Sequence, residues 1–246
     1  MDITKSSGQA EAFSKRKLMR SLHRAGASEE LAQEVWRALE PHLHSGISSH
    51  QLQRQAFRHL KQLRRSVAAR YQLKKAIMEL GPSGYPFERL MGELFKQRGY
   101  EVEVGRVLEG HCVTHEVDVV AQRDGQLTLV ECKYRNTPGF KCDVKVPLYI
   151  HSRFEDIRSM RQLDKSAFHG WIATNARFTG DAIKYADCVG LKLIGWDFPE
   201  HDSLRHWLDM AHIYPLTVLT SLSRIQKQAL LAQNLILCQE LLARPQ

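Results

Sequence analysis

The chain has 246 residues, of which 43% are hydrophobic and 25% are charged, and these proportions are typical of a globular protein. It contains no run of about 18 apolar residues and no apolar leader at its N-terminus, so we expect no membrane-spanning helix and no signal peptide. Its five cysteines lack the spacing of a disulfide framework, which favours the reducing cytoplasm over a secreted location.

The net charge of +8 is unevenly distributed along the chain. Residues 1–80 contain 15 Lys and Arg against 7 Asp and Glu, whereas residues 81–246 contain 20 of each kind. The excess in the first third indicates an anionic partner, either a nucleotide or a nucleic-acid backbone. A solvated basic helical surface explains the same charge equally well.

Helical periodicity dominates the first 80 residues, after a short strand and turn over residues 1–9. Pro41 ends the second of the expected helices, and Ser48 with Ser49 can cap the third. The helices are expected around residues 13–25, 31–39, 48–60 and 67–80. This pattern predicts a compact, mostly helical N-terminal domain.

The same segment resembles the ATP cone, a small nucleotide-binding regulatory domain best known at the N-terminus of ribonucleotide reductases. The residues that match its pattern are Lys5, Gly8, Phe13, Lys17 and Tyr71, and Ser6 stands where the family usually has Arg. The resemblance implies ATP or dATP as a regulatory ligand, with Lys5 and Lys17 on its phosphates and Gly8 allowing close backbone approach. No Walker A motif occurs, so ATP hydrolysis is not expected.

A stretch rich in Gly and Pro, residues 81–86, marks the clearest boundary in the chain. A helix is expected directly after it, with Pro86 at its start and an apolar stripe through Leu90 and Leu94. Glu88 lies at the edge of that stripe and is expected to face the sheet, whereas Glu93 is expected to be solvated. Glu88 can also be an ordinary acidic residue favoured by the helix dipole.

Residues 115–133 predict two strands joined by a tight hairpin, with Asp124-Gly125 as the turn. Because side chains alternate along a strand, Leu127, Leu129, Glu131 and Lys133 share one face. A carboxylate and an ammonium on a face that also buries leucines need a partner or a metal ion. Asp118, on the preceding strand, is well placed to complete the set.

These three polar residues have the chemistry of a metal-dependent phosphodiesterase. Asp118 and Glu131 can hold Mg²⁺ or Mn²⁺ through hard oxygen ligands and leave positions open for water and phosphate. Such an ion polarises the phosphoryl oxygen and lowers the pKa of a bound water, while Lys133 can orient that water or neutralise charge on the phosphate. An amphipathic hairpin with a surface ion pair would contain the same residues.

The spacing Asp-x12-Glu-x-Lys is similar to that of the PD-(D/E)XK nuclease superfamily, with Val117 where the family usually has Pro. Phe87-Glu88 also resembles a pair on the helix before the catalytic strands in nucleases related to Mrr, a restriction enzyme of modified DNA. The resemblance implies an Mg²⁺-dependent endodeoxyribonuclease. Its catalytic residues would be Asp118, Glu131, Lys133 and Glu88, and the first two would bind the metal.

Two further segments carry weaker signals. Cys112, His115, Cys132 and Cys142 match no standard zinc ribbon or finger, so a zinc site is not expected. The basic, turn-rich stretch over residues 134–145 could line a nucleic-acid path beside the site, and a solvated loop explains it as well.

The remaining elements complete the expected fold. Helices around residues 153–163 and 178–188 alternate with strands around 168–175 and 191–196, and residues 203–246 are helical again. This order predicts an α/β (α+β) chain with a mixed sheet flanked by helices. The expected domains are an ATP cone over residues 1–80, a nuclease domain over 81–202 and a helical C-terminal extension over 203–246.

Both resemblances, in this order, imply a Mg²⁺-dependent endonuclease that acts on DNA and responds to ATP or dATP. One alternative is a non-catalytic, nucleotide-sensing regulator that binds nucleic acid, and another is a nuclease for RNA or branched DNA. Cutting both strands of a duplex would imply a homodimer. No membrane partner is expected.

Overall fold

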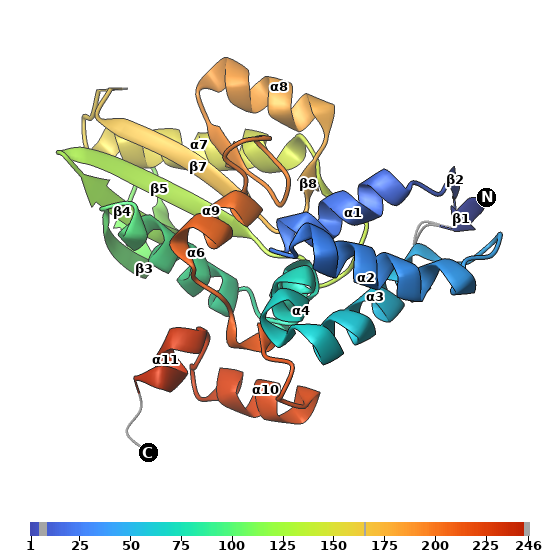
Figure 1. The fold of residues 1–246 in the computed structure, drawn as a ribbon. Coiled ribbons are helices and arrows are strands. Elements are labelled where there is room, and N and C mark those ends of the chain that lie inside the picture. The colour runs from blue at the N-terminus through green and yellow to red at the C-terminus, as the bar shows by residue number, and fades with distance from the viewer. Residues whose placement is uncertain (5–8, 165, 244–246) are drawn as a thin grey trace. The chain divides into compact units, whose positions relative to one another are not determined.

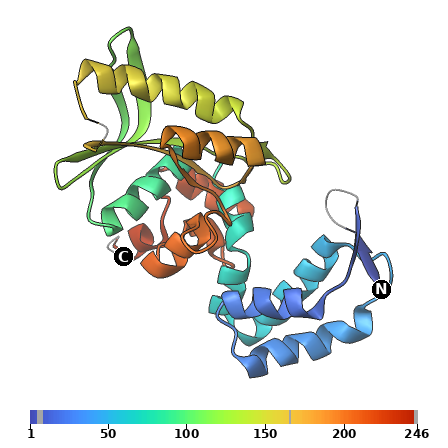
Figure 2. The same cartoon turned by 90° about the horizontal axis from the view of Figure 1, so that it is seen from above.

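The computed structural model describes residues 1–4, 9–164 and 166–243 (Figures 1 and 2). The chain divides into two compact units, the first made of Met1–Ala76 with Thr217–Lys227 and the second of Ile77–Leu216 with Gln228–Gln246. The first division lies close to the predicted boundary at residue 80. The residues of the predicted C-terminal extension are divided between the two units. Among the described residues, no helix is both long enough and apolar enough to cross a membrane.

The first unit is mostly helical. The strands β1 (Asp2–Thr4) and β2 (Ala10–Ala12) pair antiparallel, and only the first of them was expected from the sequence. The helical elements that follow are α1 (Lys15–Arg24), α2 (Glu29–Leu39), the 3-10 turn η1 (Glu40–His42), α3 (Ser49–Leu63) and α4 (Arg65–Tyr71). The expected fourth helix is divided, because α4 ends at Tyr71 and α5 (Leu73–Met78) begins after Gln72.

Local signals explain where these helices begin and what they bury. Ser48 caps α3 as predicted, in a capping box in which the Ser48 and Gln51 side chains each accept a hydrogen bond at 3.0 Å from the other residue's backbone N–H. Leu22, Val35 and Leu60, which belong to three different helices, are completely buried in one apolar cluster. The helical periodicity therefore gives this unit its own core.

The second unit is built on a five-stranded mixed sheet with the order β3-β4-β5-β7-β9. Its strands are β3 (Glu101–Glu109), β4 (Thr114–Arg123), β5 (Gln126–Lys133), β7 (Phe168–Thr174) and β9 (Lys192–Ile194). β4 pairs antiparallel with both β3 and β5, whereas β5, β7 and β9 are parallel. Asp124 and Gly125 have φ of 51° and 75°, so the predicted tight turn between β4 and β5 is confirmed. The short strands β6 (Lys141–Cys142) and β8 (Arg177–Phe178) pair separately.

Helices cover both faces of this sheet, as predicted. Figure 1 shows α7 (Lys145–Met160) and α8 (Gly180–Val189) on one face, and α6 (Tyr85–Gln97) and α9 (Leu204–Ala211) on the other. The remaining helical elements are η2 (Leu216–Val218), α10 (Arg224–Ala232) and α11 (Cys238–Leu242).

The sheet is buried between apolar side chains on each face. Leu129 of β5 and Phe154 of α7 belong to one buried cluster, and Phe95 of α6 packs edge-on against Trp171 of β7 with ring centroids 5.6 Å apart. Helix α7 begins eight residues before the expected start. Pro147 is tolerated in its first turn, where the backbone N–H would have no helical partner.

Candidate active site

Asp118 lies where the regular pairing of β4 is interrupted on both sides. The ladder with β5 begins at Val119, and the ladder with β3 skips the positions of Gly105 and Asp118. Gly105 has φ of 65°, a conformation that residues with a side chain rarely adopt. Val117 and Val120 belong to the same buried cluster, although strict alternation would place them on opposite faces. The interruption leaves the backbone of Asp118 outside both ladders, whereas the register of β3 with β4 is the same on either side of it.

The Asp118 carboxylate takes the place of a backbone partner for β5. The Cys132 N–H donates a hydrogen bond to Asp118 Oδ2 at 2.6 Å. Burial, and after it the negative charge of Glu131, raise the pKa of Asp118 to about 6, while the Cys132 N–H and the cations Lys133 and Arg153 act in the opposite direction. Asp118 is thus a partly buried acid whose environment disfavours its charge.

Glu131 is almost completely buried and held between two cations. Its side chain is 5% exposed, Oε1 lies 2.5 Å from Lys133 Nζ, and Oε2 lies 2.9 Å from a terminal nitrogen of Arg153. The other terminal nitrogen of Arg153 donates to the backbone carbonyl of Glu116. Lys133 and Glu131 therefore share one face of β5, as the alternation predicted, and the buried carboxylate has the charged partners that it requires.

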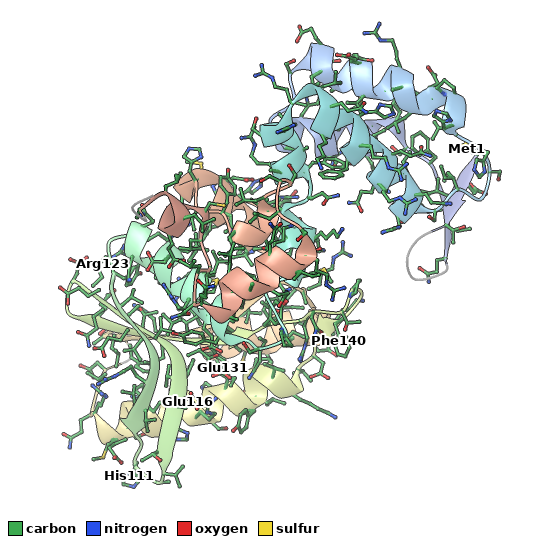
Figure 3. All side chains as sticks on the ribbon, turned by 90° about the horizontal axis from the view of Figure 1, so that it is seen from below. Met1, His111, Glu116, Arg123, Glu131 and Phe140 are labelled. Atoms are coloured by element: carbon green, nitrogen blue, oxygen red, sulfur yellow. The ribbon has the colours of Figure 1, made fainter. Side chains whose placement is uncertain are left out.

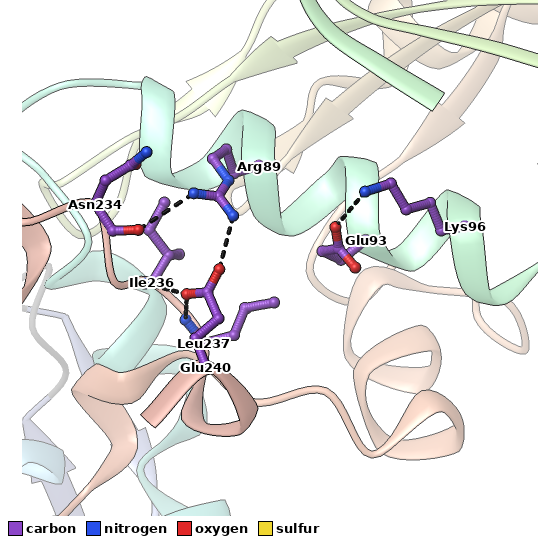
Figure 4. A network of polar contacts seen from close by, with 7 residues as sticks. All are labelled: Arg89, Glu93, Lys96, Asn234, Ile236, Leu237 and Glu240. Carbon is purple, nitrogen blue, oxygen red and sulfur yellow. Dashed lines mark hydrogen bonds and ion pairs between the residues drawn. The ribbon is translucent and has the colours of Figure 1, made fainter. Parts of the chain in front are cut away.

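Glu88 approaches these acids from helix α6. It is half-buried, and its pKa is raised to about 7, chiefly by burial and then by Asp118, Glu116 and Glu131, with Lys133 acting in the opposite direction. The expectation that Glu88 faces the sheet agrees with this arrangement. The expectation for Glu93 was wrong, because Glu93 is only 23% exposed and pairs with Lys96 at 2.6 Å (Figure 4).

Buried polar side chains at the end of β7 fix the chain that follows β5. Thr174 Oγ1 donates to the Lys133 carbonyl at 2.6 Å. Asn175 donates to the Arg135 carbonyl at 2.6 Å and accepts from the Arg135 N–H at 2.8 Å. The structure thus places the Asn175 amide in a two-bond clamp. This clamp holds the backbone two residues beyond Lys133.

Tyr134 has an anchoring role. Its hydroxyl donates to the Met78 carbonyl at 2.7 Å and accepts from the Gly81 N–H at 2.8 Å. Its ring also lies 5.9 Å from that of Phe87. Tyr134 therefore ties the segment before α6 to the end of β5, and its hydroxyl is already occupied by backbone partners.

Arg153 is the site residue that the sequence reading missed. It was expected to start a helix, but it lies well inside α7 and reaches Glu131 across 22 residues of chain. Its side chain is only 14% exposed. A signal was present, because Arg153 lies three positions after buried Ile150 and directly before buried Phe154, beside the apolar stripe of the helix.

The predicted nucleotide-binding residues are only partly described. Lys5 and Gly8 lie outside the described residues. Lys17 is exposed on α1, where its ammonium pairs with Glu11 of β2. Tyr71 is partly buried and packs against the apolar cluster of the first unit, and burial raises the pKa of its hydroxyl to about 12 despite a hydrogen bond with Ser21.

The described His, Cys, Asp and Glu side chains include few that could bind a metal ion together. Over residues 1–4, 9–164 and 166–243, no group of three or more His, Cys, Asp or Glu side chains is arranged to hold a metal ion. Cys132 and Cys142, which had been weighed as zinc ligands, are buried free cysteines. The site accordingly offers the carboxylates of Asp118 and Glu131 as the pair of hard oxygen donors that the sequence indicated.

Three family models match consecutive parts of the chain. Residues 1–77 match the ATP cone domain, residues 81–200 match a restriction endonuclease domain of the Mrr type, and residues 214–246 match the C-terminal domain of AF1548-like proteins. The order of the first two is the order that the sequence predicted. The segment over residues 203–246 had been expected only as a helical extension, and the third match identifies most of it as a domain type shared with other proteins.

Individual proteins are also similar to this chain. An uncharacterized protein of Archaeoglobus fulgidus is 36% identical over 157 residues, which are 62% of this chain and 84% of that protein. The crystal structure of AF1548, a protein of unknown function, is 33% identical and aligns with a TM-score of 0.55 over 64% of this chain and 82% of its own. A repair endonuclease from Pyrococcus abyssi is a distant likeness, with a TM-score of 0.37 and 16% identity over 46% of each chain. The chain therefore belongs to the family of the Archaeoglobus fulgidus protein, and it joins an ATP cone domain to an Mrr-type restriction endonuclease domain.

Proposed function

We propose that this protein is a metal-dependent endonuclease that hydrolyses DNA phosphodiester bonds and is regulated by ATP or dATP bound to its N-terminal domain. The observation that carries the proposal is the cluster of Glu88, Asp118, Glu131 and Lys133 within a restriction endonuclease domain. Two of its acids, Glu88 and Asp118, have pKa values raised by burial and by neighbouring carboxylates. Crowded, partly desolvated acids of this kind are more frequent at catalytic sites than elsewhere.

The donors at this site suit Mg²⁺ or Mn²⁺. Magnesium is commonly bound through one or two carboxylates together with water and substrate phosphate, and Asp118 and Glu131 supply such a pair. A bound ion would polarise the phosphoryl oxygen and lower the pKa of a water molecule. Because both oxygens of Glu131 already contact cations, an ion there would share them with Lys133 and Arg153.

The chain's own groups divide the remaining work. Lys133 orients the attacking water and offsets the negative charge that develops on the phosphate. Arg153 holds the buried Glu131 carboxylate in place through their ion pair. Glu88, with a pKa of about 7, can exchange a proton with water near neutral pH. Asp118 holds the end of β5 through the Cys132 N–H, which fixes Glu131 and Lys133 on either side of that residue.

Regulation by nucleotide rests on the ATP cone match over residues 1–77 and on the basic excess of the first 80 residues. We expect Lys5 and Lys17 to contact the phosphates and Gly8 to allow close approach of the backbone. Calorimetric titration of the full chain with ATP and dATP tests this part separately. Heat of binding that is reduced in Lys17→Ala would support it, and the absence of heat with either nucleotide would contradict it.

Cleavage of supercoiled plasmid tests the catalytic part. The wild-type chain is incubated with Mg²⁺ or Mn²⁺, with and without ATP or dATP, beside Lys133→Ala and a matched surface variant, Lys184→Ala. Lys184 is 84% exposed on α8 and should be dispensable. We expect the first variant to abolish cleavage without unfolding the chain and the second to cut as the wild type does. Equal activity of Lys133→Ala would remove the central claim.

A further inference from the structure

Two aromatic rings near the acids are open to solvent. Tyr149 on α7 is 62% exposed and Phe140, in the segment between β5 and α7, is 54% exposed. Leu148, beside Tyr149, is 43% exposed as well. Large apolar side chains gathered in the open commonly mark an interaction surface.

Tyr149 is connected to the acids through Arg153. The two residues are four positions apart on α7, and the guanidinium carbon of Arg153 lies 5.5 Å from the centroid of the Tyr149 ring. The same guanidinium is bonded to Glu131 at 2.9 Å. One side chain therefore separates the exposed ring from the buried carboxylate.

Phe140 is connected to the end of β5 through Arg135. The guanidinium carbon of Arg135 lies 5.2 Å from the centroid of the Phe140 ring, and the Asn175 clamp fixes the Arg135 backbone two residues beyond Lys133. In the view of Figure 3, Glu131 lies between Glu116 and Phe140. The second ring is thus also attached to the segment that carries the acid and the lysine.

The segment that carries both rings is basic. Residues 133–153 contain five Lys or Arg and a single acidic residue, Asp143, whereas residues 81–246 as a whole contain equal numbers of each kind. Lys141 and Lys145 are exposed in this segment. Cations beside exposed aromatic rings suit a nucleic acid, whose phosphates are negatively charged and whose bases have flat faces.

We propose that single-stranded DNA binds along this segment, with unpaired bases stacked on the free faces of Tyr149 and Phe140 and phosphates on Arg135, Lys141 and Lys145. Stacking on aromatic side chains beside a basic path is how proteins hold single strands, whereas the faces of bases within a duplex are already covered by their neighbours. The inference rests on the proposed function and names its substrate class, which is DNA with an unpaired strand.

Binding without cleavage tests the inference. Fluorescence anisotropy compares a labelled single strand with a duplex of equal length, in the Lys133→Ala background and without divalent metal. We expect the single strand to bind more tightly, and Tyr149→Ala to weaken that binding by about tenfold while changing duplex binding little. Tyr149→Phe should retain the affinity, and Phe140→Ala should weaken it. Met160→Ala is the matched control, because Met160 is 51% exposed at the other end of α7.

A 2-aminopurine base in the strand supplies a direct readout, since stacking on the Tyr149 ring should quench its fluorescence and Tyr149→Ala should restore it. Unchanged single-strand affinity in Tyr149→Ala would overturn the inference. The inference would also be overturned if light scattering showed that Tyr149→Ala converts a dimer to a monomer while the affinity for single-stranded DNA stays the same. The exposed rings would then be an interface between two copies of the chain. A wild-type chain that cuts plasmid but binds single strands no better than duplex would overturn this inference alone. A chain that prefers single strands through Tyr149 but cuts no DNA would contradict the nuclease proposal instead.

Discussion

Two aspartates of the second unit have pKa values shifted in opposite directions: Asp118 lies within β4, and Asp156 contacts the start of β4 and the turn before it. Asp118 is partly buried beside Glu131, and burial followed by the charge of Glu131 raises its pKa to about 6. Asp156, on α7, accepts hydrogen bonds from the N–H groups of Cys112 and Val113 at 2.9 and 3.3 Å, and its Oδ2 lies 2.8 Å from His115 Nε2. Those bonds, that of His115 first, hold the pKa of Asp156 well below its usual range.

The difference separates a structural carboxylate from one that is available for chemistry. Asp156 fastens the turn between β3 and β4 to α7, and a Cβ atom at Gly110 would lie only 2.1 Å from its Oδ2, so the turn fits closely around it. Asp118 has one backbone donor, and burial together with the charge of Glu131 outweighs the nearby cations Lys133 and Arg153 in their effect on its pKa. A carboxylate in that position gains more from a cation than from its present surroundings.

Asp118→Asn should have the largest effect and should separate activity from stability. We expect cleavage to fall by on the order of 10³-fold, because a ligand carboxylate is lost. Since folding raises the pKa of Asp118, the native state favours the protonated acid, and wild-type stability should decrease as pH rises from about 4 to about 6. The Asn variant keeps an acceptor for the Cys132 N–H and carries no charge. It should therefore be more stable than wild type at pH 8, by on the order of 1 kcal/mol, and equally stable near pH 4.

Urea unfolding at several pH values, beside the plasmid assay, measures both quantities. A variant that is inactive and less stable at pH 8 would show that Asp118 is a structural residue like Asp156. The proposed difference between a structural Asp156 and a functional Asp118 would then be wrong.

Arg153→Ala should have the next largest effect. The substitution leaves the buried Glu131 with Lys133 alone, so we expect a loss of about 1–3 kcal/mol in the free energy of unfolding and a fall in cleavage of on the order of 10- to 100-fold. Arg153→Lys should recover part of both. Arg158→Ala is the matched control, because Arg158 pairs with Glu155 on the same helix, where both side chains are more exposed. If the two Ala variants cleave equally well, Arg153 does not belong to the site.

Sequence patterns predicted what depends on neighbours along the chain. The Ser48 cap, the Asp124-Gly125 turn and the shared face of Glu131 and Lys133 all follow from spacings of a few residues. The position of Glu88 also followed from one helix period. These features need no knowledge of how distant segments pack.

The missed features depend on packing between segments far apart. Arg153 reaches Glu131, and Asp156 reaches His115, across 22 and 41 residues. The interruption at Asp118 lies opposite Gly105 on a neighbouring strand, and a glycine with positive φ within a strand gives no periodic signal. The assignment of Thr217–Lys227 to the first unit likewise depends on tertiary contacts, such as the hydrogen bond from Thr217 to the Ala76 carbonyl at 2.7 Å.

Asp156→Asn should change stability with the opposite pH dependence to Asp118→Asn and should have little direct effect on cleavage. Because folding lowers the pKa of Asp156, its contribution to stability is complete above the ordinary pKa of an aspartate and is lost as pH falls toward the lowered value. The variant should therefore be less stable than wild type at pH 7, and the difference should disappear in acid. Thermal unfolding from pH 3 to pH 8 measures the trend. A difference that grows in acid would contradict the assignment of Asp156 as the anionic anchor of the turn.

Glu240→Gln should have the smallest effect on cleavage and stability. This variant tests whether a carboxylate next to the site has a structural role, as Asp156 does. Glu240 contacts Arg89 at 2.7 Å and accepts the N–H groups of Ile236 and Leu237 at 2.6 and 2.8 Å, so it ties the C-terminal segment to α6 beside Glu88 (Figure 4). The Gln amide oxygen can still accept hydrogen bonds, but the charge that pairs with Arg89 is lost. We therefore expect a loss of about 0.5–1 kcal/mol in the free energy of unfolding and a change in cleavage of no more than a few-fold.

Glu88→Gln is the reference for this variant, because it removes the acid that α6 presents to the hairpin. If Glu240→Gln lowers kcat as much as Glu88→Gln while urea unfolding changes little, the clamp positions α6 for catalysis. A carboxylate whose hydrogen bonds are satisfied, such as Glu240, would then contribute to catalysis, and a raised pKa would not distinguish the functional acids from the structural ones. If both kcat and stability change only slightly, Glu240 belongs with Asp156, and the raised pKa remains the better guide to which acids of this domain carry the chemistry.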